Sequence, residues 1–421
     1  MKTTFFSALS LAAMVTAASC SWNSTNSTHA TNSTKTSLPA GKLSVLSADT
    51  LLLRKYAQGL NARGKPSLTY VSGVGWKALE MVYNATGDKK YLDYIIKSVD
   101  NLVTPDGALN DYNLTYYTVD DIRIGETLIY LYKETGALKY KGAADVLRSQ
   151  LETNPRNSEG GFWHRSIYPN QMWLDGLYMI APFYAHYSTY YEKSNSTAFD
   201  DIIKQFELTH TNCVNKNPGQ TGILKHGYDE SRTASWADEA TGASPEAWNR
   251  ALGWYVMAIV DVLDFFPASH PGVAKLLAIL EENIAGIKNN VDPESKLWWL
   301  VMTQPGKEKN YIESSAGAMF VYAILKGIRM GYLDSTKYLE TATTAYNSLV
   351  EKFVFLNQTD GGLNWEGTVS VGSLKDKGDY DYYVSVALET DDLKGYGPFI
   401  MASVEFEKLG NQSFHSIGKE W

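Results

Sequence analysis

Cysteine is scarce in this sequence. Only Cys20 and Cys213 occur among 421 residues, so no network of disulfide bonds holds the fold. A single bond between the two is open but disfavoured, because Cys20 lies in a tract that we expect to be flexible. The cysteines and the seven scattered histidines also lack the spacing of a zinc site, so we expect no metal ion.

An excess of positive charge is also missing. The chain has 38 Lys and Arg against 46 Asp and Glu, which gives a formal net charge of −8 at pH 7. Nucleic acids and anionic membrane surfaces both require a basic face on the protein. We therefore expect neither as the main partner of this chain.

Several motifs of common enzyme classes are absent. The sequence has no Gly-x-Ser-x-Gly elbow, no phosphate-binding P-loop and no dinucleotide fingerprint after a strand. We therefore expect no cofactor. After the N-terminal region no stretch is long and apolar enough to span a bilayer.

The N-terminal region has the pattern of a targeting segment. Residues 1–18 combine Lys2, an apolar run and small residues near a cleavage site, so we expect a signal peptide. We expect residues 19–40 to form a flexible Ser/Thr/Asn-rich arm. The rest of the chain, 41–421, is expected to form one catalytic domain. We expect a secreted, extracellular glycoprotein, because eight Asn-x-Ser/Thr sites occur, at Asn23, Asn26, Asn32, Asn84, Asn113, Asn195, Asn357 and Asn411.

Helical periodicity dominates from Leu43 to Gly410, and Gly, Pro, Asn and Asp interrupt it at intervals. The sequence Thr-Gly-Asp-Lys-Lys-Tyr at 86–91 recurs in looser form at 135–140 and 332–338, each time between two predicted helices. We predict twelve helices, at 43–60, 69–85, 89–103, 120–134, 138–151, 173–190, 196–211, 246–265, 271–289, 312–331, 335–352 and 395–409.

Repeated helix–turn–helix units of about 50 residues cannot bury their apolar faces alone and must stack on one another. An open α-solenoid and a closed barrel both satisfy this requirement. Four of the predicted helices are richer in apolar and small residues than their partners, which favours closure. The predicted fold is all-α, an (α/α)6 barrel of six helix hairpins, with long rim loops at 152–172, 212–245 and 353–394. Short strands are expected near 368–374 and 380–388.

Aromatic residues are abundant, with 28 Tyr and 11 Trp, and such rings often stack on sugars, although most of them serve core packing. Asp175 lies among them, in Met-Trp-Leu-Asp-Gly-Leu-Tyr-Met at 172–179. Burial there would raise the pKa of Asp175, as a proton donor near neutral pH requires. The alternative is a carboxylate that caps the N-terminus of a helix, and the pattern does not separate the two.

Two further motifs have the same ambiguity. Asp120 and the adjacent Asp121 open another apolar helix, where one can cap the helix while the other pairs with Arg123. Arg250 and Trp254 share a helix face and together suit a sugar acid, yet an arginine at such a place is more often an ion-pair partner. Ser244, Pro245 and Glu246 resemble the start of that helix.

Six motifs occur together and in order: Val-Asp-Asp-Ile-x-x-Gly at 119–125, Met-Trp-Leu-Asp-Gly-Leu-Tyr-Met at 172–179, His-Gly-Tyr-Asp-Glu-Ser at 226–231, Trp-Asn-Arg-Ala-Leu-Gly-Trp-Tyr at 248–255, Glu-Ser-Ser-Ala at 313–316 and Lys-Gly-Tyr-Gly-Pro-Phe at 394–399. With these motifs the sequence resembles glycoside hydrolase family 105, the unsaturated rhamnogalacturonyl hydrolases, from about residue 40 to 410. The related family 88 of unsaturated glucuronyl hydrolases shares this architecture.

The resemblance implies a six-hairpin barrel without a metal, which removes an unsaturated (C4=C5) uronic acid from the non-reducing end of pectin-derived rhamnogalacturonan oligosaccharides. It implies that a carboxylic acid protonates C4, that activated water attacks C5, and that the resulting hemiketal opens. Asp175 matches the general acid/base, and Asp120 matches the second aspartate, although Asp121 departs from the commoner residue after it. The implied substrate-binding residues are His226, Arg250, Trp248, Trp254, Trp173 and Trp76, with Arg250 or His226 a candidate for the uronate carboxylate.

Two other functions remain open on the residues alone. The chain can be another (α/α)6 glycosidase, acting on a saturated or an unsaturated glucuronyl sugar. It can also be a non-catalytic glycan-binding protein that uses its Trp- and Tyr-lined bowl, although the carboxylates and Arg250 argue against that alternative.

Overall fold

The computed structural model describes residues 38–193, 195–375 and 377–410. The expected signal peptide, nearly all of the expected arm, Cys20 and the sites at Asn23, Asn26, Asn32 and Asn411 lie outside the described residues. Among the helices of the described ranges, none has the length and apolar character needed to cross a membrane.

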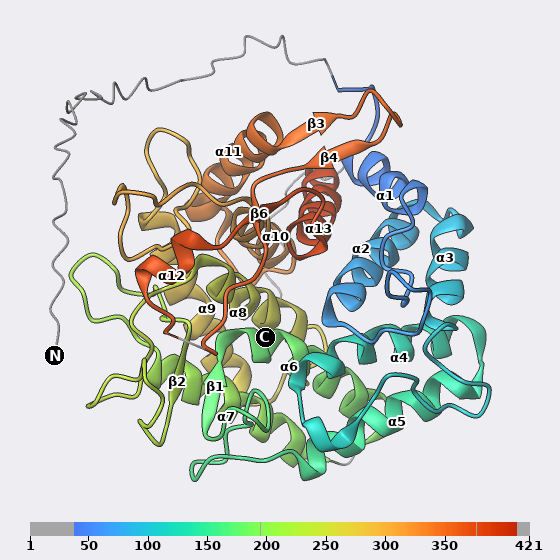
Figure 1. The fold of residues 1–421 in the computed structure, drawn as a ribbon, viewed down its shortest axis with the longest axis horizontal. Coiled ribbons are helices and arrows are strands. Elements are labelled where there is room, and N and C mark those ends of the chain that lie inside the picture. Colours follow the sequence, from blue (N-terminus) through green and yellow to red (C-terminus); the bar gives the residue numbers. More distant parts are fainter. Residues whose placement is uncertain (1–37, 194, 376, 411–421) are drawn as a thin grey trace, which may run out of the picture. The chain divides into compact units, whose positions relative to one another are not determined.

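Two rings of helices make up the described part of the chain (Figure 1). The inner ring closes because each of its members packs on the next and the last packs on the first: α2 (Tyr70–Thr86), α4 (Gly125–Thr135), α6 (Leu174–Tyr191), α8 (Asn249–Val262), α10 (Ser314–Arg329) and α13 (Leu393–Leu409). The outer ring consists of α1 (Leu43–Leu53), α3 (Lys89–Val99), α5 (Leu138–Thr153), α7 (Ser196–Asn212), α9 (Gly272–Asn289) and α11 (Ser335–Phe353).

Each outer helix packs mainly on one inner helix, and α1 at the start of the barrel pairs with α13 at its end. This is the predicted (α/α)6 barrel of six hairpins, and the prediction is confirmed. Composition explains the two rings. Every residue of α8 is buried, whereas α11 buries only one face and presents polar residues on the other. A helix that is apolar on all sides must lie inside, and an amphipathic helix must lie outside.

The repeated Thr-Gly turns end inner helices as predicted. Gly87 and Gly136 have φ of 71° and 70°, a left-handed conformation that favours glycine at the end of a helix. Asp88 then caps α3 by accepting a hydrogen bond from the Lys90 amide, and Asp334 caps α11 in the same way. The local sequence therefore sets where each hairpin turns.

Some boundaries differ from the prediction. Helix α1 ends at Leu53 rather than near residue 60, because the chain turns at Lys55 and Ala57, both with positive φ. The segment before α4 is the 3-10 helix η2 (Val119–Ile124).

The predicted helix start at residues 244–246 is wrong, because α8 begins at Asn249. Glu246 instead accepts hydrogen bonds from Thr303 Oγ1 and Gln304 Nε2, at 2.5 Å each.

Short strands and one short helix lie in the rim segments. Strand β1 (Gln171–Trp173) pairs with β2 (Gly227–Asp229), and β3 (Val354–Leu356) pairs with β4 (Leu363–Trp365). Strand β5 (Thr368–Val369) pairs with β6 (Leu388–Glu389), so strands occur where they were expected but are shorter. The predicted strand at 380–388 is mostly helical in the structure, because helix α12 (Tyr380–Ser385), which Asp379 caps, occupies its first part. A further 3-10 turn, η1 (Leu114–Tyr116), precedes η2.

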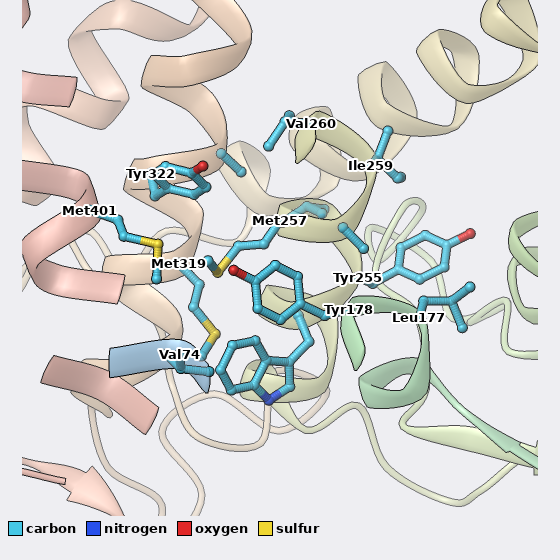
Figure 2. Packing of buried hydrophobic residues seen from close by; sticks show 14 of the residues in the cluster. Val74, Leu177, Tyr178, Tyr255, Met257, Ile259, Val260, Met319, Tyr322 and Met401 are labelled. Atoms are coloured by element: carbon cyan, nitrogen blue, oxygen red, sulfur yellow. The ribbon is translucent and has the colours of Figure 1, made fainter. Parts of the chain in front are cut away.

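The middle of the barrel is filled by side chains. Figure 2 shows Met257, Met319 and Met401 pointing into the space between the inner helices, beside Tyr178. Methionine is unbranched and flexible, so it fills irregular gaps between helices of different direction. The predicted site residues Asp120 and Asp175 lie at the rim, where the inner helices begin.

Candidate active site

The pairing of β1 with β2 brings together the two segments that hold the first aspartate and its partner. Trp173 lies opposite Gly227 in this register, and the Leu174 amide donates to the His226 carbonyl at 2.9 Å. Asp175 therefore enters the first turn of α6 directly beside His226. In Figure 1, β1 and β2 lie next to one another on one side of the ring, and β3 and β4 lie on another side.

Asp175 contacts a fully buried histidine. His226 Nε2 lies 2.9 Å from Asp175 Oδ2, although the ring N–H is not well aligned with that oxygen. On the other side of the ring, His226 Nδ1 lies 2.6 Å from the Tyr383 hydroxyl of α12. Either group can be the donor in this contact, because the role of Nδ1 depends on the tautomer of the ring.

The expected raised pKa of Asp175 is wrong for this structure. Burial on its own raises the pKa of Asp175, but the charge and hydrogen bond of His226, with a smaller effect of His164, outweigh it and hold the pKa below its ordinary value. The sequence motifs placed His226 in the site but did not show its contact with Asp175, which the β1–β2 pairing creates. The side chain of Asp175 retains 14% exposure, so the substrate can still reach it.

Asp120 has the opposite environment. It lies in η2, and burial together with the charge of Asp175 raises its pKa, against the smaller effects of His164 and Arg165. His164 Nε2 lies 3.8 Å from Asp120 Oδ1, and burial lowers the pKa of this histidine. Asp120 keeps 32% of its side chain exposed. The charge of Asp175 therefore acts on Asp120, and the pKa values of the two carboxyl groups are shifted in opposite directions.

Trp173 joins the two halves of the site. His164 stacks on its indole at 4.2 Å, and His226 meets it edge-on at 5.6 Å. Tyr168 also stacks on Trp173, at 4.9 Å. Each of the two histidines thus lies between Trp173 and one aspartate, in an arrangement that fixes the rings by packing.

Trp248 and Arg250 complete the cluster. Trp248 lies against His226 and stacks on Tyr383, and the Arg250 guanidinium lies 4.6 Å from the Trp248 ring. Arg250 Nη1 donates to the Val369 carbonyl at 2.5 Å, and Nη2 donates to the Ser370 carbonyl at 3.1 Å. Arg250 therefore braces β5 and the residue after it, with Glu313 Oε1 at 3.8 Å from Nη1.

The structure supports the alternative structural role for Arg250 better than direct binding of a uronate. Its side chain is 1% exposed, and only the buried Nε lacks a partner among the described residues. A role for Arg250 in holding a carboxylate stays a prediction.

The two remaining predicted tryptophans lie deeper. Trp254 is buried beneath the site, where it stacks on Tyr178 at 5.0 Å and meets Tyr70 edge-on. Trp76 is fully buried, and its indole N–H donates to the Ala57 carbonyl at 2.7 Å. The expectation that Trp76 binds substrate is therefore corrected: the ring packs in the core and presents no surface to a ligand.

Several residues of the site were not found from the sequence. His164 and Tyr383 come from rim segments that carry no recognisable motif, and Tyr70 begins α2, where burial raises its pKa. The scarcity of histidine was the one available signal, since only seven occur and a buried histidine needs polar partners. Over the described ranges, no three His, Cys, Asp or Glu side chains gather as a metal would require, and metal-free chemistry stays a prediction.

The site can perform acid/base chemistry. Two titratable carboxyl groups whose environments move their pKa values apart can divide the roles of proton donor and proton acceptor between them. The surrounding aromatic rings provide flat apolar surface of the kind that packs against a sugar ring.

Comparison with known proteins agrees with this geometry. Residues 49–410 match Glycosyl Hydrolase Family 88. A solved structure of a glycoside hydrolase from family 105 of C. acetobutylicum ATCC 824 is 39% identical, with a TM-score of 0.81, and the match covers 87% of this chain and 100% of that one.

Two curated relatives match as well. Protein Atu3128 of Agrobacterium fabrum is 37% identical over 215 residues, which are 49% of this chain and 89% of that protein. Unsaturated rhamnogalacturonyl hydrolase YesR of Bacillus subtilis is 25% identical over 287 residues, 66% of this chain and 75% of that protein.

The barrel and its rim carboxylates define a glycoside hydrolase of the six-hairpin class. The family match spans most of the described chain. The chain belongs to Glycosyl Hydrolase Family 88, and its likeness to the family 105 structure confirms the resemblance drawn from its motifs.

Proposed function

We propose that this glycoside hydrolase removes an unsaturated uronic acid from the non-reducing end of pectin-derived rhamnogalacturonan oligosaccharides. The reaction is hydration of the C4=C5 bond. A proton adds to C4, water adds to C5 and loses a proton, and the resulting hemiketal opens and releases the next sugar. Because the anomeric carbon is not the reacting centre, the spacing rule for retaining and inverting glycosidases does not apply.

The observation that carries the proposal is the contact between Asp175 and His226. Carbon is a poor base, so protonation of C4 needs a positioned acid. Asp175 is ionised in the free protein, since its pKa is held below the ordinary value. We propose that Asp175 delivers this proton and that His226, whose Nε2 lies 2.9 Å from Asp175 Oδ2, holds the carboxyl group in place.

The substrate itself shifts this balance. A bound uronate displaces water and adds a negative charge near Asp175, and both effects raise the pKa of a carboxyl group. Asp175 then takes up a proton from solvent and passes it to C4. The carboxylate that remains accepts the proton of the attacking water, so the proton count closes over one turnover.

Asp120 is the second carboxyl group. Positive charge develops at C5 and the ring oxygen after protonation of C4, and a nearby carboxylate stabilises it. Asp120 is the more exposed of the two aspartates, and the charge of Asp175 acts on it. Since its pKa is raised, we expect activity to fall on the acid side as Asp120 becomes protonated.

Loss of the conjugated double bond can be followed by its ultraviolet absorbance. The wild-type chain should remove this chromophore from a lyase-made rhamnogalacturonan disaccharide. Asp175→Asn and Asp120→Asn should abolish turnover while the circular dichroism spectrum stays the same. Asp121→Asn is the matched control, because it removes a neighbouring carboxyl group outside the contact with His164.

If the wild-type chain leaves the ultraviolet absorbance of every unsaturated uronide unchanged, the proposed function is wrong. Two alternatives make different predictions in the same experiment. A related glycosidase would release product from a saturated sugar or prefer an unsaturated glucuronyl substrate. A glycan-binding protein would bind the disaccharide saturably and turn over none of it.

We also propose that the chain is secreted and carries N-glycans. Among the described sites, Asn113 is exposed, and its Oδ1 accepts hydrogen bonds from the amide and the hydroxyl of Thr115, which leaves Nδ2 open to solvent. Mass spectrometry of the secreted protein before and after enzymatic deglycosylation tests this. An unmodified Asn113 would contradict it at that site.

A further inference from the structure

Arg165 lies at the rim, directly after His164 of the site. The backbone places it: the Val119 amide donates to the His164 carbonyl at 3.1 Å, and the Ser166 hydroxyl donates to the Tyr116 carbonyl at 2.7 Å. Residues 164–166 therefore run alongside residues 116–119.

The guanidinium of Arg165 makes no hydrogen bond, ion pair or ring contact with any of the described residues. Its charge acts on the site, because it lowers the pKa values of Asp120 and Asp121 against the larger effect of burial. Neither carboxylate lies within ion-pair distance of it. A half-buried arginine whose nearby carboxylates do not bind it is available to a ligand.

The surface around Arg165 suits a sugar chain. Tyr116 is 56% exposed, and Ile167 is 61% exposed. The exposed Tyr116 ring can pack against a sugar, and Tyr116 and Ile167 lie close to Asp120 and His164 in the chain. Under the proposed function the unsaturated sugar lies against Asp175, which is less exposed than Asp120, so we place the leaving part of the substrate on the Asp120 side, toward Tyr116 and Arg165.

We infer that Arg165 binds a carboxylate on the leaving part of the substrate. This inference rests on the proposed function and adds a preference to it, namely for a released saccharide that is itself acidic. Arginine binds a carboxylate through two parallel N–H···O contacts, which sets orientation as well as affinity. The carboxylate can belong to the first leaving sugar or to the second, and both present the same chemistry to Arg165.

Three unsaturated substrates separate these cases. One disaccharide has a neutral leaving sugar, a second has a uronic acid there, and a tetrasaccharide has a neutral sugar followed by a uronic acid. The measured quantity is kcat/KM for each acidic substrate divided by kcat/KM for the neutral one. Changes in the pKa of Asp120 affect all substrates alike and cancel in this ratio.

Arg165→Gln should lower the ratio about tenfold for the acidic substrate that fits, mainly through KM, and Arg165→Lys should restore part of it. Added salt should lower the wild-type ratio too, because exposed charges are screened. Arg63→Gln is the matched control, since Arg63 is an exposed arginine of the loop before α2 with no side-chain contact, and it should leave the ratio unchanged.

A ratio that Arg165→Gln leaves unchanged for both acidic substrates would overturn the inference and leave the proposed function standing. Turnover of none of the three substrates by the wild-type chain would overturn both. A loss confined to the disaccharide assigns the carboxylate to the first leaving sugar, and a loss confined to the tetrasaccharide assigns it to the second. Either of these results supports the inference.

Discussion

Replacing His226 by glutamine removes the imidazole that faces Asp175 and leaves the aspartate in its buried position. In the wild-type chain His226 outweighs burial and holds the pKa of Asp175 below its ordinary value. Without the imidazole, burial is the largest remaining influence, so we expect the pKa of Asp175 to rise above the ordinary value. The change should therefore appear both in stability and in its dependence on pH.

The size of the effect follows from the contact. A hydrogen bond to a charged group contributes about 1.5–3 kcal/mol, and we expect the lower part of this range because Asp175 retains 14% exposure. The sign follows from the direction of the shift. A lowered pKa gives stability that is present above the unfolded value of about 3.9 and is lost as the pH falls through the folded value. In His226→Gln the raised pKa reverses the sign, so the variant should lose stability relative to the wild type as the pH rises.

A double-mutant cycle isolates the interaction. Denaturant unfolding of the wild type, His226→Gln, Asp175→Asn and the double variant should give a coupling energy of about 1.5 kcal/mol at pH 6. His270 and Asp200 supply the control, because this pair is 3.5 Å apart with Asp200 68% exposed, and its coupling should stay below about 0.5 kcal/mol. A coupling for His226 and Asp175 no larger than that of the control, or one that persists undiminished toward acid pH, would refute the reasoning.

Three further outcomes follow from the contacts. Tyr383→Phe removes the 2.6 Å partner of His226 Nδ1, so kcat should fall about tenfold with little change in KM, as single-turnover kinetics would show. Burial and the charge of Asp120 raise the pKa of Asp121 to about 7, so ionisation of Asp121 destabilises the fold as the pH rises from about 4 to 7. The variant Asp121→Asn should therefore be more stable than the wild type by about 2 kcal/mol at pH 8 and equally stable at pH 4. Denaturant midpoints at the two pH values measure this difference. Trp76→Phe loses the bond to the Ala57 carbonyl and should cost about 1–2 kcal/mol of stability in thermal unfolding while KM stays the same.

The barrel could be predicted from the sequence because its signals are local. Apolar periodicity, the Thr-Gly turns and the contrast between all-apolar and amphipathic helices each depend on a few neighbouring residues. Closure follows from the same contrast, since an all-apolar helix such as α8 needs cover on every side. The early end of α1 was missed because the residues with positive φ, Lys55 and Ala57, are not glycines, so the sequence carries no signal of a turn there.

The aspartates of the site could also be predicted, but their protonation could not. Asp175 and Asp120 stand out as carboxylates in apolar motifs, and burial does act on both in the expected direction. What reverses the result for Asp175 is a histidine 51 residues away in the chain, placed by the register of two three-residue strands. Strands that short carry no periodic signal.

The difference between the two aspartates shows which parts of the chain decide the chemistry. Both lie at the beginning of inner elements, so the barrel alone would give them similar burial. The rim segments supply His226 at 2.9 Å to one and His164 at 3.8 Å to the other, and the closer contact is the one that overcomes burial. A change confined to the rim can therefore exchange donor and acceptor roles without altering a helix. The inner helices therefore set the positions of the two aspartates, and the rim segments set which of the two binds its proton more strongly.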